Sequence, residues 1–318
     1  MRVPLPRPAR EQCWAGWLLC ALCAAGLNAQ TPPSSPPRGE AVAIPPETCR
    51  RCHQAYYETW AVSTHARMDG RLRGAPAQRG CEACHGSGVD HVQSGDRALI
   101  SRFTGSPAET IERACLKCHE RGRRLYWRGS AHESRNITCT RCHTLHKKAE
   151  TPQPGLRYQE RPLETRLLRK QTSMEICLQC HLVQKARLQR SSHMPLREGK
   201  LTCVDCHNPH GTATPKLLTE NSVNENCYRC HAEKRGPFLW EHPPVAEDCL
   251  NCHEAHGSVH AALLKVRPPR LCQRCHMRAG HSTLPQPAAN RLIYNLGCAN
   301  CHSQIHGSNH PSGVRLHR

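Results

Sequence analysis

Cys139-Thr140-Arg141-Cys142-His143, followed at once by Thr144-Leu145-His146, is the stretch that decides the fold of this chain. A Cys-x-x-Cys-His run is the attachment signature of c-type haem, in which two thioether bonds hold the porphyrin and the histidine binds the iron. The pattern occurs ten times. Its cysteines, predicted to bind haem, are Cys49, Cys52, Cys81, Cys84, Cys115, Cys118, Cys139, Cys142, Cys177, Cys180, Cys203, Cys206, Cys227, Cys230, Cys249, Cys252, Cys272, Cys275, Cys298 and Cys301. Its histidines, predicted to be the proximal iron ligands, are His53, His85, His119, His143, His181, His207, His231, His253, His276 and His302.

A Cys-x-x-Cys pair alone is also compatible with a zinc site, a redox dithiol or a disulfide. The fifth position distinguishes these readings. Histidine accounts for only 23 of 318 residues, yet it follows all ten pairs. Neither zinc binding nor disulfide formation requires that coupling, so the sequence predicts ten covalently bound haem c groups.

Thirteen histidines remain to supply a second ligand for each iron. Their spacing defines a repeat of motif, intervening histidine, motif and closely following histidine, clearest over 115–146, 177–210 and 227–256 and looser over 49–91 and 272–306. The repeat predicts ten distal ligands: His65, His91, His132, His146, His193, His210, His242, His256, His281 and His306. His260, His310 and His317 are left over, and the choice between His306 and His310 stays open. Met68, Met174, Met194 and Met277 are too few and too scattered to serve generally.

The two ligands of one iron must approach from opposite porphyrin faces. His143 and His146 lie about one helical turn apart, so we expect His146 to ligate a different haem. Such cross-ligation would hold neighbouring haems close together. Haems with both axial positions filled offer no iron to a substrate, which favours electron transfer and predicts no catalytic residues and no enzyme activity.

Residues 1–29 contain Arg2, Arg7 and Arg10 before an apolar run and are predicted to be a signal peptide that is removed. Residues 30–47 are a Pro-rich leader, and residues 48–318 are the predicted decahaem cytochrome c domain, with candidate halves at 48–186 and 187–318. No later segment reaches 18 apolar residues, so no membrane-spanning helix is expected after the signal peptide. The formal charge of +19 would suit nucleic acid, but export and haem propionates exclude that partner.

The predicted fold is mainly α with much irregular structure, a multihaem cytochrome c whose ten haems form the core. It is expected to be built from repeated dihaem units, with two pentahaem halves as a candidate division. Helices are expected over 54–68 and 161–171, the latter in a long spacer, 147–176, that is a candidate seam between haem groups. Nine steps at the aromatic stacking distance give a haem chain of at least roughly 40–60 Å, against about 40–45 Å for a membrane, although a folded-back arrangement is the alternative.

Further segments carry a family resemblance. They are Trp60-Ala-Val-Ser-Thr-His65, Trp127-Arg-Gly-Ser-Ala-His132 and the ending Cys298-Ala-Asn-Cys-His302-Ser-Gln-Ile-His306-Gly-Ser-Asn-His310-Pro-Ser-Gly313. With the ten motifs, they make the chain similar to the MtrA/DmsE family of periplasmic decahaem c-type cytochromes, which includes the PioA and MtoA members. The resemblance implies a cytochrome inserted in an outer-membrane β-barrel that passes electrons between periplasm and cell exterior.

The resulting hypothesis is a periplasmic electron-transfer protein associated with the outer membrane. Its expected partners are an outer-membrane β-barrel porin-like protein, a periplasmic or inner-membrane cytochrome as donor or acceptor, and, as a further candidate, an extracellular multihaem cytochrome. Electrons could flow outward, for iron(III) or sulfoxide-type respiration, or inward, for iron(II) oxidation. The alternatives are a multihaem reductase of nitrogen or sulfur oxyanions, a soluble periplasmic electron shuttle and a haem storage protein.

Overall fold

The computed structural model describes residues 43–71, 79–146, 167–170, 172–276 and 297–317. By its internal contacts the chain divides into Met1–Ala41 and Val42–Arg318, and all described residues lie in the second unit. The predicted signal peptide, most of the predicted leader and His281 lie outside the described residues. The candidate halves at 48–186 and 187–318 remain a prediction.

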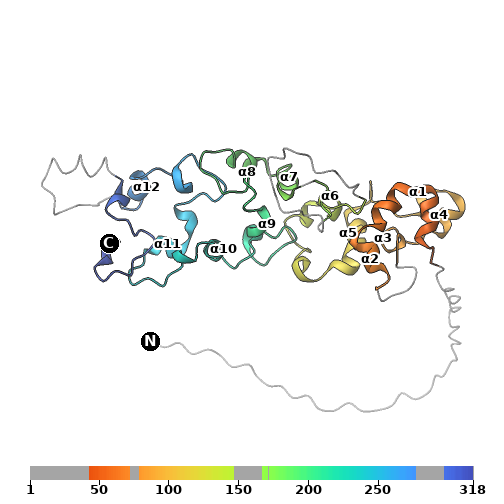
Figure 1. The fold of residues 1–318 in the computed structure, drawn as a ribbon, viewed down its shortest axis with the longest axis horizontal. Coiled ribbons are helices and arrows are strands. Elements are labelled where there is room, and N and C mark those ends of the chain that lie inside the picture. The colour runs from red at the N-terminus through yellow and green to blue at the C-terminus, as the bar shows by residue number, and fades with distance from the viewer. Residues whose placement is uncertain (1–42, 72–78, 147–166, 171, 277–296, 318) are drawn as a thin grey trace, which may run out of the picture. The chain divides into compact units, whose positions relative to one another are not determined.

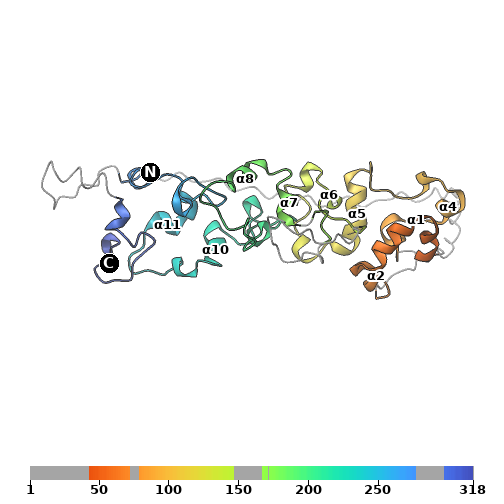
Figure 2. The ribbon, with the colours of Figure 1, turned by 45° about the horizontal axis from the view of Figure 1, so that its top comes forward.

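Short helices joined by turns make up the described part of Val42–Arg318, which contains no β-strand. Helices α1 to α4 gather at one end of this unit, and from α5 to α12 the helices run along it broadly in the order of the chain (Figures 1 and 2). The prediction of a mainly α fold with much irregular structure is therefore confirmed. The α-helices are α1 (Pro46–Ala61), α2 (Thr64–Asp69), α3 (Glu82–His85), α4 (Val89–Ser94), α5 (Ala108–His119), α6 (Cys139–Cys142), α7 (Ser173–Cys177), α8 (Leu182–Arg187), α9 (Cys203–Cys206), α10 (Val223–Tyr228), α11 (Pro243–Glu247) and α12 (Arg270–Gln273). The 3-10 helices are η2 (Arg97–Leu99), η3 (Gly122–Arg124), η4 (Glu133–Arg135), η6 (Pro215–Leu217), η7 (Ala232–Lys234), η8 (Cys249–Asn251), η9 (Ala261–Leu263), η10 (Cys298–Asn300) and η11 (Gly313–Arg315).

The helical turns coincide with the Cys-x-x-Cys-His motifs. In eight motifs the backbone N–H of the histidine donates to the carbonyl of the first cysteine at 2.9–3.0 Å, as between His143 and Cys139. Because residues three apart share one face of a helical turn, this bond presents both cysteines to the same side. Each motif is thus a local structure that a five-residue sequence can specify.

The helix predicted over 54–68 is two helices in the structure. α1 ends at Ala61, and Ser63 then caps α2 by accepting a hydrogen bond from the backbone N–H of Ala66 at 3.3 Å. A serine at this position satisfies an amide that would otherwise lack a partner at a helix start. The predicted helix therefore exists, but it is broken at Val62 and Ser63.

The helix predicted over 161–171 is wrong where the structure describes it. Leu167 has φ of 50°, and Leu168 forms an antiparallel bridge with His143. The same bridge recurs between His207 and Leu218 and between His253 and Leu264. The bridging leucine follows its histidine by 25 residues in the first copy and by 11 in the other two, so the long spacer is an insertion in a shared loop.

Three glycines join successive repeats: Gly211, Gly257 and Gly307, each directly after a closely following histidine. Their φ values are 104°, 150° and 134°, in the region that favours glycine. A Cβ at Gly257 would overlap the carbonyl of Arg187, and one at Gly211 would overlap the carbonyl of Tyr126. Each glycine therefore lets the backbone of one repeat lie directly against the segment that precedes the intervening histidine of the repeat before it.

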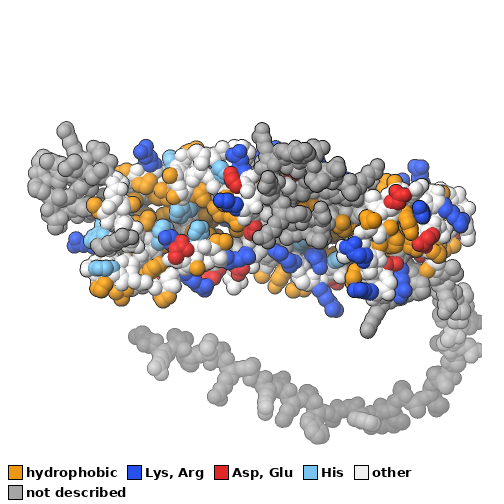
Figure 3. Space-filling model, in the orientation of Figure 1, with side chains coloured by type: hydrophobic (Ala, Val, Ile, Leu, Met, Phe, Trp, Pro, Cys, Tyr) orange, Lys and Arg blue, Asp and Glu red, His pale blue; other side chains and the backbone are white. Residues whose placement is uncertain are grey.

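Few apolar side chains are buried in this unit. Met174 and Leu188, at 0% and 2% exposure, are the largest fully buried side chains of the described residues, and with Leu196 they form one small cluster. Large apolar groups such as Val62 and Leu125 are exposed, and orange side chains are scattered over the face drawn in Figure 3. A chain of this size ordinarily buries a much larger core. We expect porphyrin rings to supply the missing apolar bulk.

Among the described residues, no helix combines the length and the apolar character needed to cross a bilayer.

Candidate haem-binding sites

In four of the five repeats, the first cysteines of the two motifs lie close together. The thiols of Cys115 and Cys139 share a hydrogen bond that raises the pKa of Cys115 and lowers the pKa of Cys139. The first cysteines of the seventh and eighth motifs, Cys227 and Cys249, share the same kind of hydrogen bond. This bond lowers the pKa of Cys249 to about 7. Burial and the charge of the neighbouring motif's first cysteine raise the pKa of Cys81 to about 12 and that of Cys272 to about 11. For the fifth and sixth motifs, α7 packs against α9.

Even-numbered motifs meet the next motif through their second cysteines. Burial is the main reason why the pKa of Cys84 is raised, and the charge of Cys118 in the third motif adds to the shift. The same relation joins the fourth motif to the fifth, the sixth to the seventh and the eighth to the ninth. The cysteine pairs are Cys142 with Cys180, Cys206 with Cys230 and Cys252 with Cys275.

These two kinds of neighbour alternate at eight of the nine steps between successive motifs, and at the step from the fifth motif to the sixth α7 packs against α9. The motifs therefore follow one another in space in the order of the chain. Macrocycles attached to these cysteines would share that order.

The imidazole rings lie in pairs, and each pair joins a motif histidine to a predicted distal histidine. In even-numbered motifs the partner comes from the end of the following repeat, with ring centres 6.0–6.4 Å apart. These pairs are His85–His146, His143–His210, His207–His256 and His253–His306. In odd-numbered motifs the partner is the intervening histidine of the preceding repeat, with ring centres 5.9–6.2 Å apart. These pairs are His119–His65, His181–His132 and His276–His242. The first motif pairs within its own repeat, His53 with His91 at 6.2 Å.

This spacing fits one iron atom between two imidazoles. A metal–nitrogen bond of about 2 Å on each side, plus roughly 1 Å from each nitrogen to its ring centre, separates the ring centres by about 6 Å. The eight pairs at 5.9–6.4 Å match that value. The residues present therefore fit bis-histidine haem.

The Nδ1 atoms of these imidazoles face backbone carbonyls. Nδ1 of His85 lies 2.8 Å from the oxygen of Ser101, and Nδ1 of His132 lies 2.8 Å from the oxygen of Pro209. Nδ1 faces a carbonyl in His91, His146, His207, His242, His253 and His302 as well. A carbonyl can only accept, so Nδ1–H must donate. The lone pair of Nε2 is then left for a metal.

Burial keeps several of these imidazoles neutral. Burial is the largest cause that lowers the pKa of His146 and His256, and it brings the pKa of His210 to about 4. The neutral ring is the form that binds metal. His65 differs from these histidines, because its Nδ1 atom is buried and has no hydrogen-bond partner among the described residues.

Two predicted ligands are not paired in this way. His193 donates from Nδ1 to the carbonyl of Arg190 at 2.9 Å, but its Nε2 lies 3.0 Å from a carboxylate oxygen of Glu198. His231, the motif histidine for which His193 would be the counterpart, has Nδ1 3.6 Å from Glu233. In the structure each of these two imidazoles lies beside a carboxylate instead of facing the other ring.

The tenth motif histidine has a partner that sequence reasoning left over. The ring centres of His302 and His317 are 5.2 Å apart at 41°, and Nδ1 of His302 donates to the carbonyl of Arg315. His281, predicted for this repeat, lies outside the described residues. The signal that could have pointed to His317 is its place on the C-terminal side of the fifth repeat, since the distal ligands of the other even-numbered motifs also come from C-terminal to their own repeat.

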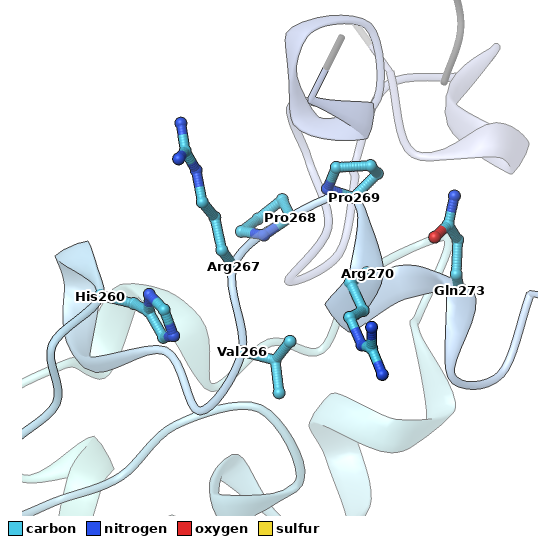
Figure 4. A pocket seen from close by; sticks show the side chains of 7 residues that line it. All are labelled: His260, Val266, Arg267, Pro268, Pro269, Arg270 and Gln273. Carbon is cyan, nitrogen blue, oxygen red and sulfur yellow. The ribbon is translucent and has the colours of Figure 1, made fainter. Parts of the chain in front are cut away.

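The other leftover histidines have different surroundings. His260 lines an open cavity of about 610 Å³ with Arg267 and Arg270 (Figure 4). The carbonyl of His310 accepts the indole N–H of Trp240 at 3.0 Å, which ties the last repeat to the one before it. Between His306 and His310, only His306 lies opposite a motif histidine.

Known proteins share these features. Residues 193–236 and 242–281 each match the family described as the doubled CXXCH motif, and residues 81–161 match the family described as cytochrome c-type protein NrfB-like. The multiheme cytochrome MtrA of Shewanella baltica (strain OS185) is 40% identical over 285 residues, which cover 86% of this chain and 81% of that protein. The paired motifs indicate covalently bound haem c, and together with the relative they support electron transfer by a multihaem c-type cytochrome. The chain belongs to the MtrA family of multihaem c-type cytochromes.

Proposed function

We propose that this protein binds ten haem c groups, one at each motif, in the order of the motifs along the chain, and that it conducts electrons along them. The observation that carries the proposal is the alternation of neighbouring first and second cysteines at eight of the nine steps between motifs, with α7 packed against α9 at the other. Haem supplies the redox couple. The chain's own residues attach each haem, orient it and fix its neighbours.

The imidazole pairs support one rule for the distal ligands. Each even-numbered motif takes the closely following histidine of the next repeat, and each odd-numbered motif from the third to the ninth takes the intervening histidine of the previous repeat. The rule assigns His193 to the iron at His231, in place of its contact with Glu198. At the two ends, His91 serves the first motif and His317 serves the tenth. His281 is then left without an iron.

Two imidazoles on every iron leave no coordination position for a substrate. This favours electron transfer over reduction of nitrogen or sulfur oxyanions at haem. The closely packed order of the motifs also favours conduction over haem storage, because storage does not require neighbouring sites to touch.

We further propose that the protein works in the periplasm, in association with the outer membrane, inside a β-barrel partner. The predicted signal peptide supports export. The surface is unsuited to lipid, since charged side chains, Arg and Lys more than Asp and Glu, are scattered over the face shown in Figure 3. A barrel with a polar lumen could enclose such a surface. Cytochromes on either side of the membrane would supply and accept the electrons, in metal reduction or iron oxidation.

Replacing His146 by alanine should remove the distal ligand of the haem attached at Cys81 and Cys84, because His146 lies opposite His85. The expected result is a high-spin ferric signal of one-haem intensity in the electron paramagnetic resonance spectrum, where the native protein shows low-spin haems only. The H85A/H146A double variant should still perturb one haem, whereas H143A/H146A should perturb two. The reverse pattern would contradict cross-ligation.

The tenth motif is tested by comparing His317→Ala with His281→Ala. We expect the first variant alone to produce one high-spin haem, because His317 is the histidine that lies opposite His302 among the described residues. A high-spin haem in the His281 variant, with none in the His317 variant, would return the assignment to His281.

The conduit is tested by purifying the protein from outer membranes in mild detergent and identifying the proteins that accompany it. A β-barrel in constant ratio to the cytochrome is expected. Its absence, with all of the cytochrome released in the periplasmic fraction, would instead indicate a soluble shuttle.

A further inference from the structure

Glu112 is a buried acid that haem attachment does not require. It lies in α5, three residues before Cys115, and is only 6% exposed. Ile111, Leu116 and Trp127, each at 6–7% exposure, are its buried neighbours in this part of the chain. A carboxyl group in such surroundings is costly when charged, unless it has partners.

The groups near the Glu112 carboxylate stabilise its charge only weakly. Neither Glu112 Oε1 nor Trp127 Nε1 makes a hydrogen bond within the described residues. Burial is the largest cause that raises the pKa of Glu112, and the charge of Glu133 adds to it, while the Trp127 indole and Arg128 oppose it. Arg128 is two-thirds exposed and contacts Glu120, so solvent screens its charge.

The carboxyl also acts on the cysteines of two motifs. Its charge raises the pKa of the Cys115 thiol and opposes the lowering of the pKa of the Cys139 thiol. These thiols are the attachment points of the third and fourth haems, and they hydrogen-bond to each other. The helix α5, which carries Glu112 and Cys115, packs against α6, which carries Cys139, so Glu112 lies near both attachment sites.

The internal repeat shows that the fold does not need a charge here. Met174 and Asn224 occupy the same position, three residues before the first cysteine, in the fifth and seventh motifs. Both are buried, at 0% and 6% exposure. Met174 is apolar, and Asn224 is neutral with its amide fully engaged, donating to Val245 and Ala246 and accepting from Cys249. Of these three motifs, only the third has an ionisable group at this position.

We propose that Glu112 takes up a proton when the haems attached at Cys115 and Cys139 are reduced and releases it when they are oxidised. This rests on the proposed function. An electron arriving from a neighbouring haem removes one positive charge from a ferric iron, so the carboxylate loses a favourable charge nearby. It then forms an O–H bond with a proton from water, and oxidation reverses both changes.

The coupling has a definite sign. Reduction favours protonated Glu112, so the reduced protein binds more protons than the oxidised protein in the pH range between the two titrations. The midpoint potentials of these haems must then fall as pH rises through that range. A neutral residue at position 112 should hold them at their low-pH limit.

The test is potentiometric and proton-uptake titration of the full-length holoprotein, comparing native protein with Glu112→Gln and Glu112→Met. Glu112→Met places the residue of the fifth motif in the third. The expected result is a loss of pH dependence at two haems and the uptake of about one proton fewer on full reduction in both variants. The control is Glu109→Gln, which changes an exposed acid on the same helix that pairs with Arg113 and should leave both readouts unchanged.

An unchanged pH dependence in both Glu112 variants, with native haem content and spectrum, would overturn the proposal. Haem content by pyridine haemochrome assay separates this failure from failure of the proposed function. Fewer than ten haems in native protein would count against the decahaem proposal alone, whereas the comparison of variants still reports on Glu112.

Discussion

The two imidazoles that face one another across each proposed iron site come from different parts of the chain, and the rest of the structure depends on this constraint. A motif histidine and the histidine three residues later cannot bind the same iron from opposite faces. Each must therefore be paired with a histidine from another part of the chain. His146 lies opposite His85, and His210 lies opposite His143. Each repeat is thereby tied to its neighbours, and the order of motifs in the sequence becomes an order in space.

A second constraint follows from the small amount of apolar burial. Met174 and Leu188 belong to a cluster of three buried side chains. This cluster is much too small to stabilise the whole unit Val42–Arg318 by itself. Backbone joints at Gly211, Gly257 and Gly307, together with Nδ1–carbonyl bonds, position the histidines instead. These backbone contacts fix the positions of the imidazoles but bury little apolar surface. Haem binding and folding are therefore expected to be strongly coupled.

Local chemistry made the motifs predictable from sequence, and it also made predictable that His146 faces a histidine of another motif, since a five-residue turn fixes where its histidine points. His317 was missed because it follows the repeat instead of belonging to it, and only the fold brings it to His302. The helix expected over 161–171 failed for a similar reason. Periodic leucines suggested an amphipathic face, but Leu168 is held by a bridge to His143. The contact of His193 with Glu198 likewise has no signature in the sequence.

The measurement that tests the central claim most directly is an experimental structure of the holoprotein with every iron located by anomalous scattering. The account predicts ten irons, each with its nearest neighbours at the motifs directly before and after it in sequence. Each iron should lie between a motif histidine and a histidine from an adjacent repeat, apart from the two end sites. Irons whose nearest neighbours skip motifs, or irons ligated by both histidines of one His-x-x-His pair, would contradict it.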